Sequence, residues 1–520
     1  MQRIYFLVLL FFLPGFLWSQ DATTIQNIRE EGLNNTQVMD IAFQLTEVSG
    51  PRVTGSPGLK RASDYAVNQL KQWGLTDVVL DPWGDFGKGW ELKKSYIAMS
   101  APWYKPIAGF PKVWTAGTNG LKKASVILIN AKDSAELVNN YKGKLTGKIL
   151  IMNTPVHYVP NDLPDLERWT TAQLDSMQNI KPKAPDTAGA NQRMRRFFGD
   201  FMNARRMAAT LNKLAHDEGA VAILTSSPRN HDGTVFVQGG GSYKSEDPAG
   251  FTDLALPLED YNMIIRLLKN QTPVELELDV QTRFLTDDIK GYNVLGEIKG
   301  TDKKLKDEVV MLGGHLDSWQ GATGATDNAA GSAVMMEAVR ILQKLGIKPR
   351  RTIRIALWSG EEQGLYGSRE YVKKTFADRA DMKLKPAHEK FDVYFNLDNG
   401  TGRIRGIYLQ ENEASRSIMA QWLAPFADLG ATTITYSNTT GTDHQSFDGV
   451  GLPGFQFIQD VVEYDTRTHH SNIDSYDHLV AGDLEQAATI VAAMVYQAAM
   501  SDAKVPRKEL PKPAPSRFPF

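Results

Sequence analysis

The chain of 520 residues contains no cysteine. Disulfide bonds, thiolate metal ligands and a cysteine nucleophile are therefore excluded. Any metal site has to use the nitrogen and oxygen atoms of histidine, aspartate and glutamate. The stability of a chain of this length has to come from a large hydrophobic core, to which bound metal can add.

A strong excess of charge is also absent. The formal net charge is −2 at pH 7 and the pI is about 6.5. Proteins that bind nucleic acid or anionic membranes usually carry a basic excess, so the composition favours neither partner. A chain of this length, at about 150 residues per domain, suggests two to four domains.

A long apolar run occurs only at the N-terminus. Residues 1–20 carry Arg3, an apolar run from Ile4 to Leu13, and a break at Pro14 and Gly15. The run is shorter than the roughly 20 residues that a membrane-spanning helix needs, and the pattern is typical of a secretory signal peptide. We therefore expect export to a secreted or periplasmic location and no membrane contact once the signal is removed.

The remaining pattern predicts three further units and a tail. Strand-like runs SVILIN, KILIMN and AVAILT lie in the middle of the chain, around a proline-rich and charged surface segment from Pro155 to Arg196. The last residues, with KELPKPAPSRFPF, are expected to extend over the surface or to be disordered. The predicted boundaries are 21–121 for the N-terminal part of the catalytic domain, 122–282 for an inserted domain, 283–501 for the catalytic domain and 502–520 for the tail.

Apolar strands and helices alternate from Asp307 onward. The strand patterns EVVMLGG, RTIRIALWSG, FDVYFNLDNG and GFQFI are separated by helical patterns, one of which begins near Asn328 and ends at Gly346. Such alternation predicts an α/β fold with a largely parallel mixed sheet flanked by helices.

Acidic and histidine side chains follow several of these strands. Because open α/β sheets hold their sites at the carboxyl ends of the strands, we expect these side chains to be neighbours in space. They are His315 and Asp317 after EVVMLGG, Glu361 and Glu362 after RTIRIALWSG, Asp398 at the end of FDVYFNLDNG, and Asp327 at the start of the following helix.

So many carboxylates in one crevice would repel one another unless cations compensated them. A pair of zinc ions that share one carboxylate is the simplest compensation. Each zinc needs about three protein ligands, so the scheme requires one more histidine. The stretch THHSNIDSYD offers His469 and His470, and we favour His470 because Ser471 and Asp474 follow within reach of its ring.

The motifs GGHLDSW, GATDNAAG, WSGEEQGLYGS, NLDNG, GTDHQSF and HHSNIDSYD occur in this order. Together they resemble the dinuclear zinc exopeptidases, the family that includes secreted leucine aminopeptidases and glutamate carboxypeptidases. The resemblance covers most of Asp307 to Ser501 and extends less specifically to SGPRVTGSPGLKRASDYAV. The region from Lys122 to Thr282 is similar to the protease-associated domain often inserted in these enzymes.

The resemblance implies a role for each site residue and a cis peptide bond between Asp327 and Asn328. Asp443 and His444 of GTDHQSF would lie near the substrate pocket. For the reaction centre it implies that His315 and Asp398 bind one zinc, that Glu362 and His470 bind the other, that Asp327 bridges both, that Glu361 is the general base, and that Asp317 holds the ring of His315.

The function that the resemblance implies is hydrolysis of short peptides or dipeptides from one end, with a homodimer as a further expectation. Whether the N-terminal or the C-terminal residue is removed stays open. An inactive receptor-like or binding protein on the same fold would be expected to lose ligands or the base, and all of them are present. A glutaminyl-cyclase-like acyltransferase is a second alternative and would work with a single zinc.

Overall fold

A computed structural model describes residues 15–160, 162–181 and 187–514. Most of the predicted signal segment, residues 1–14, lies outside this range, as do residues 515–520 of the predicted tail. The first helix, α1, begins at Gly15, within the segment predicted as signal peptide. In the described part of the chain, none of the helices combines the length and the apolar character needed to cross a membrane.

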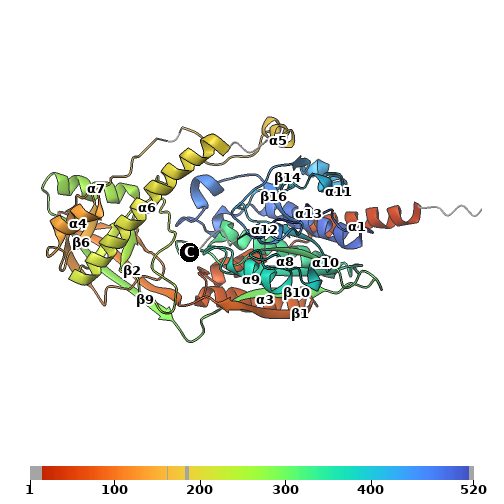
Figure 1. The fold of residues 1–520 in the computed structure, drawn as a ribbon, viewed down its shortest axis with the longest axis horizontal. Coiled ribbons are helices and arrows are strands. Elements are labelled where there is room, and N and C mark those ends of the chain that lie inside the picture. The colour runs from red at the N-terminus through yellow and green to blue at the C-terminus, as the bar shows by residue number, and fades with distance from the viewer. Residues whose placement is uncertain (1–14, 161, 182–186, 515–520) are drawn as a thin grey trace, which may run out of the picture.

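Two mixed sheets with helices packed on them make up the protein, which confirms the predicted α/β class (Figure 1). The centre of the first sheet is parallel, because β11 pairs in parallel with both β12 and β13, and β13 with β16. The strands at its edges include antiparallel pairs. In spatial order its strands are β1 (Thr76–Asp85), β10 (Lys290–Ile298), β12 (Thr352–Trp358), β11 (Val309–His315), β13 (Phe391–Asn396), β16 (Gly454–Gln459), β14 (Ile404–Tyr408) and β15 (Thr433–Thr435).

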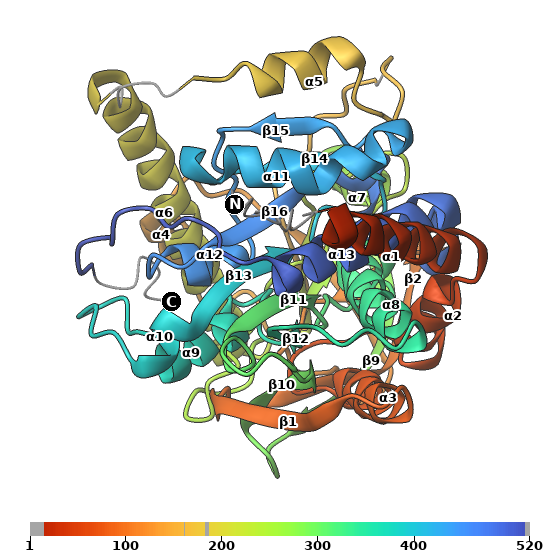
Figure 2. The ribbon, with the colours of Figure 1, turned by 90° about the vertical axis from the view of Figure 1, so that its right-hand side faces the viewer.

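Both faces of the first sheet are buried. Successive side chains of a strand point to opposite faces, so a buried strand contributes to a hydrophobic core on each side. In β11, Val310 and Leu312 join one hydrophobic core and Met311 joins another on the other face. Helices therefore cover the sheet on both sides (Figure 2). The larger core packs against α1 (Gly15–Asn34), α2 (Val38–Phe43), α3 (Pro57–Gln72), α8 (Ala330–Lys344), α11 (Arg416–Leu423) and α13 (Ala481–Met500), and the other against α9 (Tyr366–Thr375), α10 (Pro386–Lys390) and α12 (His444–Asp448).

The second sheet is built from residues between Gly89 and Leu285, so it begins earlier in the chain than the predicted inserted range 122–282. Its two longest strands, β2 and β9, form an antiparallel pair although they lie far apart in the sequence. The spatial order is β3 (Lys105–Pro106), β2 (Gly89–Ala101), β9 (Glu275–Leu285), β5 (Lys122–Ile129), β6 (Ile149–Met152), β7 (Ala222–Thr225), β8 (Asp253–Ala255) and β4 (Phe110–Pro111), with α4 (Ser134–Tyr141), α6 (Thr187–Glu218) and α7 (Leu258–Lys269) packed on it.

The segment between β6 and α6 crosses from the second sheet to the edge of the first. Its helix α5 (Thr171–Gln178) lies beside β15 (Figure 2). Arg168 forms ion pairs with Asp460 at 2.9 Å and with Asp483 at 2.6 Å, and both acids are buried. The described part of the predicted surface segment thus connects the two sheets.

The C-terminal tail, as far as residue 514, lies along the first-sheet region. The backbone N–H of Val505 donates a hydrogen bond to Asp392 at 2.7 Å, and that of Ala514 donates to the carbonyl of Arg379 at 3.1 Å. The remaining short helical segments are η1 (Gln44–Val48), η2 (Ala325–Ala329), η3 (Glu413–Ser415), η4 (Ala424–Leu429), η5 (Tyr464–Thr468) and η6 (Tyr476–His478).

Candidate metal centre

The parallel strands bring the predicted site residues to one edge of the first sheet. The register of β11 places His315 opposite Trp358 of β12 and Gly313 opposite Asn396 of β13. The loops that follow β12 and β13 carry the Glu361–Glu362 doublet and Asp398, so these carboxylates reach the same crevice as His315.

His315 lies between two carboxylates. Its Nε2 atom is 3.2 Å from Oδ1 of Asp327 and 3.2 Å from Oδ1 of Asp398. Its Nδ1 atom is 3.0 Å from the backbone carbonyl of Asp317. The ring is 1% exposed, so one imidazole nitrogen is held by the backbone while the other faces the acidic cluster.

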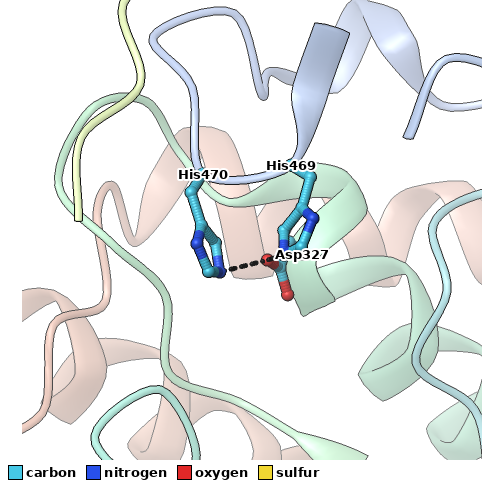
Figure 3. A group of neighbouring side chains, drawn as sticks. All are labelled: Asp327, His469 and His470. Atoms are coloured by element: carbon cyan, nitrogen blue, oxygen red, sulfur yellow. Dashed lines mark ion pairs between the residues drawn. The ribbon is translucent and has the colours of Figure 1, made fainter. Parts of the chain in front are cut away.

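His470 approaches the same cluster from the other side. Its Nε2 atom is 3.0 Å from Oδ2 of Asp327 and 3.0 Å from Oε2 of Glu362. Figure 3 shows His470 reaching from its loop to Asp327 at the start of the helical segment. Asp327 therefore uses one oxygen toward each histidine, and each histidine has a second carboxylate beside it.

His469 is the second histidine of the same loop. Its Nε2 atom lies 3.8 Å from Oδ2 of Asp327, and its ring stacks on Tyr464 with centroids 4.6 Å apart. The side chain of His469 is 29% exposed, compared with 10% for His470. His470 therefore makes the closer approach and is also in contact with Glu362.

The donor set fits zinc. Two groups of side chains bring their ligand atoms within 4.8 Å of one another, namely His315 with Asp327 and Asp398, and Asp327 with His469 and His470. Oε1 of Glu362 is buried and takes part in no hydrogen bond in the described part of the chain. Imidazole nitrogen and carboxylate oxygen are ligands that zinc accepts, and an uncompensated carboxylate is costly to bury.

The electrostatics of the cluster favour a cation as well. Burial and the charge of Asp398 raise the pKa of Glu361 well above its usual range, although His315 opposes the shift. Burial and the charge of Asp327 raise the pKa of Glu362 to about 7, although His470 opposes the shift. A bound cation would favour the ionised form of these carboxylates.

Asp317 positions both parts of the centre. Asp317 was expected to hold the ring of His315. The backbone carbonyl of Asp317 makes the hydrogen-bond contact with Nδ1 of that ring, whereas its carboxylate is 3.7 Å from the same nitrogen. The carboxylate accepts hydrogen bonds from the backbone N–H groups of Glu361 and Glu362, both at 3.3 Å. Asp317 therefore connects the loop after β11 with the loop after β12.

The expectation that Ser471 and Asp474 orient the ring of His470 is wrong. Asp474 accepts hydrogen bonds from the backbone N–H groups of Thr326 at 2.6 Å and Asp327 at 3.1 Å, and Ser471 donates its hydroxyl to the carbonyl of Arg467. The reason is the loop conformation: φ of His470 is 59°, which directs its ring to the carboxylates while Asp474 reaches the start of η2.

The start of α8 packs closely on the loop after β13. The peptide bond between Asp327 and Asn328 is cis, as the resemblance implied. The side chain of Asn328 donates to the carbonyl of Leu397 at 2.9 Å and accepts from the N–H of Gly331 at 3.0 Å. A Cβ atom on Gly331 would lie 2.2 Å from the same carbonyl, so only glycine allows this approach.

Asp443 and His444 are both fully buried beside the centre rather than in it. Burial raises the pKa of Asp443 to about 7 and lowers that of His444 to about 4. Nε2 of His444 lies 3.1 Å from the carbonyl of Thr439. His444 also borders a cavity of about 860 Å³ that is lined further by Arg369.

Arg52 supports the centre from behind, and sequence reasoning missed it. Its guanidinium is fully buried and donates to the carbonyls of Leu316 at 2.6 Å, Leu45 at 2.9 Å and Gly324 at 2.8 Å, and also to that of Thr323. The signal in the sequence is an arginine within the turn-rich SGPRVTGSPG.

The fold and the centre together define a metal-dependent hydrolase of the α/β class. Residues 293–495 match the sequence model described as peptidase family M28. This segment is similar to peptidase family M28, and the chain is a peptidase.

Relatives extend the similarity over nearly the whole chain. Carboxypeptidase Q of Mus musculus is 26% identical over 490 residues, which are 94% of this chain and 90% of that protein. The crystal structure of a peptidase M28 precursor from Shewanella amazonensis SB2B has a TM-score of 0.65 at 23% identity and covers 95% of this chain and 99% of its own. The structure of a zinc aminopeptidase from Bacillus subtilis, BSAP, has a TM-score of 0.54 at 19% identity, and the match covers 90% of this chain and 96% of that chain. These solved structures support the fold.

Proposed function

We propose that the protein is an exported, zinc-dependent exopeptidase that hydrolyses short peptides or dipeptides. The observation that carries the proposal is the position of Asp327 between His315 and His470, with Asp398 beside the first histidine and Glu362 beside the second. This arrangement offers two neighbouring cation positions that share one carboxylate. Zinc is supported by the nitrogen and oxygen donors and by the zinc aminopeptidase among the similar structures.

Each residue has a defined part in this proposal. His315 and Asp398 would hold one zinc ion, Glu362 and His470 the other, and Asp327 both. Bound zinc supplies Lewis-acid chemistry, which polarises a carbonyl group and makes water more acidic. Asp317 holds the ring of His315 and the backbone of the glutamate doublet in place.

Glu361 moves the proton. One carboxylate oxygen of Glu361 is 4.0 Å from Nε2 of His315, so the group lies beside the centre without the close contact that Glu362 makes with His470. As general base, Glu361 takes a proton from the attacking water and then delivers it to the leaving amine. The amide bond breaks, and a free carboxylate and a free amine leave the site.

Removal of metal provides the direct test. We expect the metal-free protein to be inactive on a panel of dipeptides and short peptides, and activity to return with about two zinc ions per chain. Comparison of free, N-acylated and C-amidated forms of one peptide then identifies the end that is trimmed. Intolerance of the acyl group indicates an aminopeptidase, intolerance of the amide a carboxypeptidase, and intolerance of both a dipeptidase.

Two results would contradict the proposal. A protein that holds zinc but hydrolyses none of the peptides would be a binding protein on this fold. A protein that reaches full activity with a single zinc and transfers an acyl group would be an acyltransferase.

The two adjacent histidines provide a matched pair of variants. We expect His470→Ala to lower the number of bound zinc ions from two to one, because His470 is 3.0 Å from both Asp327 and Glu362. We expect His469→Ala to keep both ions, because its nitrogen is 3.8 Å from Asp327 and its ring packs on Tyr464. Metal analysis after dialysis measures both; the opposite result would make His469 the ligand.

A further inference from the structure

The loop that carries His470 is paired with a segment of the second-sheet region, residues 235–237. The backbone N–H of Asn472 donates to the carbonyl of Val235 at 3.0 Å, and that of Val237 donates to the carbonyl of His470 at 2.8 Å. The N–H of Val235 donates to the side-chain carbonyl of Asn472 at 2.7 Å. The two segments therefore form a short antiparallel ladder beside the metal centre.

Aromatic packing reinforces this ladder. The ring of Phe236 lies 5.7 Å from the ring of His470, and that of Trp319 lies 6.1 Å from it, both between centroids. The guanidinium of Arg229 lies 4.3 Å above Phe236, and its Nη2 atom donates to the carbonyl of His469 at 3.4 Å. Phe236 is thus held between a cation of its own segment and the imidazole.

The two histidines of the centre are held in different ways. Nδ1 of His315 is 3.0 Å from a backbone carbonyl, which is the usual means of orienting a metal-binding imidazole. Nδ1 of His470 is buried and has no hydrogen-bond partner among the described residues. The backbone of His470 has a φ of 59°, which is uncommon for a residue other than glycine and needs support from its surroundings.

That support comes from a segment of the loop between β7 and β8, which is itself held by hydrogen bonds and by burial. Asn230 is 3% exposed, and its side chain accepts from the N–H of Phe236 at 2.7 Å and donates to the carbonyl of Leu256 at 2.9 Å. Val235 and Val237 on either side of Phe236 are fully buried. Phe236 therefore contacts His470 from a segment whose own position is fixed by these contacts.

We propose that residues 229–237 are a positioning segment for His470, so that the second-sheet region sets the zinc affinity of the half of the centre formed by His470 and Glu362. The inference rests on the proposed function, because it takes His470 as a zinc ligand. It assigns the second-sheet region a part in building the reaction centre, with Phe236 as the principal positioning residue.

The test is zinc titration of the full-length, metal-free protein by calorimetry. We expect Phe236→Ala to weaken one of the two zinc sites by about 10- to 100-fold, the loss typical when the support of a metal ligand is removed, and to leave the other site unchanged. Phe236→Tyr keeps the ring and should restore the affinity. Tyr104→Ala, an exposed aromatic residue of the same region, is the matched control and should leave both sites unchanged.

Asn472→Ala removes the side-chain acceptor for Val235 from the other partner of the ladder and should weaken the same site. In a His470→Ala background, Phe236→Ala should leave the remaining site unaffected. If Phe236→Ala weakens the remaining site in that background, the inference is wrong. It is also wrong if Phe236→Ala and Asn472→Ala, each made in the wild-type protein, bind zinc at both sites with wild-type affinity. If His470→Ala itself keeps two zinc ions, the assignment of His470 as a zinc ligand, on which this inference rests, is at fault instead.

Discussion

Glu361→Gln should retain both zinc ions and lose hydrolysis. We expect kcat to fall by about 100- to 10,000-fold, the range that general acid–base catalysis contributes. Glutamine has almost the same shape as glutamate but cannot accept the proton from water. Because the side chain is 8% exposed and its backbone N–H donates to Asp317, the neutral amide should fit without disturbing the loop.

The matched control is the adjacent glutamate. Oε2 of Glu362 is 3.0 Å from Nε2 of His470, so Glu362→Gln should lose zinc together with activity. Measurement of kcat, KM and zinc content for both variants separates proton transfer from metal binding. Loss of zinc in Glu361→Gln, or activity within tenfold of the wild type, would refute the role of Glu361 as the base.

Much of the centre could be predicted because its residues follow local patterns. His315 and Asp398 lie at or just beyond the carboxyl ends of apolar strands, and the carboxyl ends of parallel strands lie at one edge of the sheet. Asp327 precedes an amphipathic helix, α8, whose predicted end at Gly346 is close to the observed end at Lys344. Local pattern and global fold agree at these positions.

The supporting contacts could not be predicted, because they join segments that are distant in sequence. Asp474 supports the backbone of Asp327, and Phe236 packs on His470 across more than two hundred residues. The second sheet begins earlier in the chain than the predicted inserted domain. The pairing of β2 with β9, which lie far apart in the sequence, brings residues before 122 into that sheet. Nothing local in Asp474 or Phe236 indicates which distant partner it meets.

Arg52→Met should destabilise the protein by about 3 to 5 kcal/mol, the usual cost of breaking a buried charge network. The carbonyls of Leu316, Thr323 and Gly324 would lose their donor, and they belong to the loop between His315 and Asp327. The carboxylates whose charges act on Arg52, Asp474 foremost, would lose a buried countercharge. Both effects act on the metal-free protein, so urea unfolding in the presence of a chelator measures them without a contribution from zinc.

Two further substitutions identify the origin of the loss of stability in Arg52→Met. Arg52→Lys keeps the charge, but one ammonium group cannot reach carbonyls that the planar guanidinium contacts in several directions, so we expect an intermediate loss. Arg283→Met removes an arginine that pairs with Glu91 at the surface, where its side chain is 55% exposed, and should cost no more than about 1 kcal/mol. If Arg52→Met unfolds at the same urea concentration as Arg283→Met, the loop between His315 and Asp327 holds its conformation without the arginine. In that case Asp317, which connects the loop to the backbone of Glu361 and Glu362, and Asp474, which accepts from the backbone of Asp327, are the groups that maintain the centre.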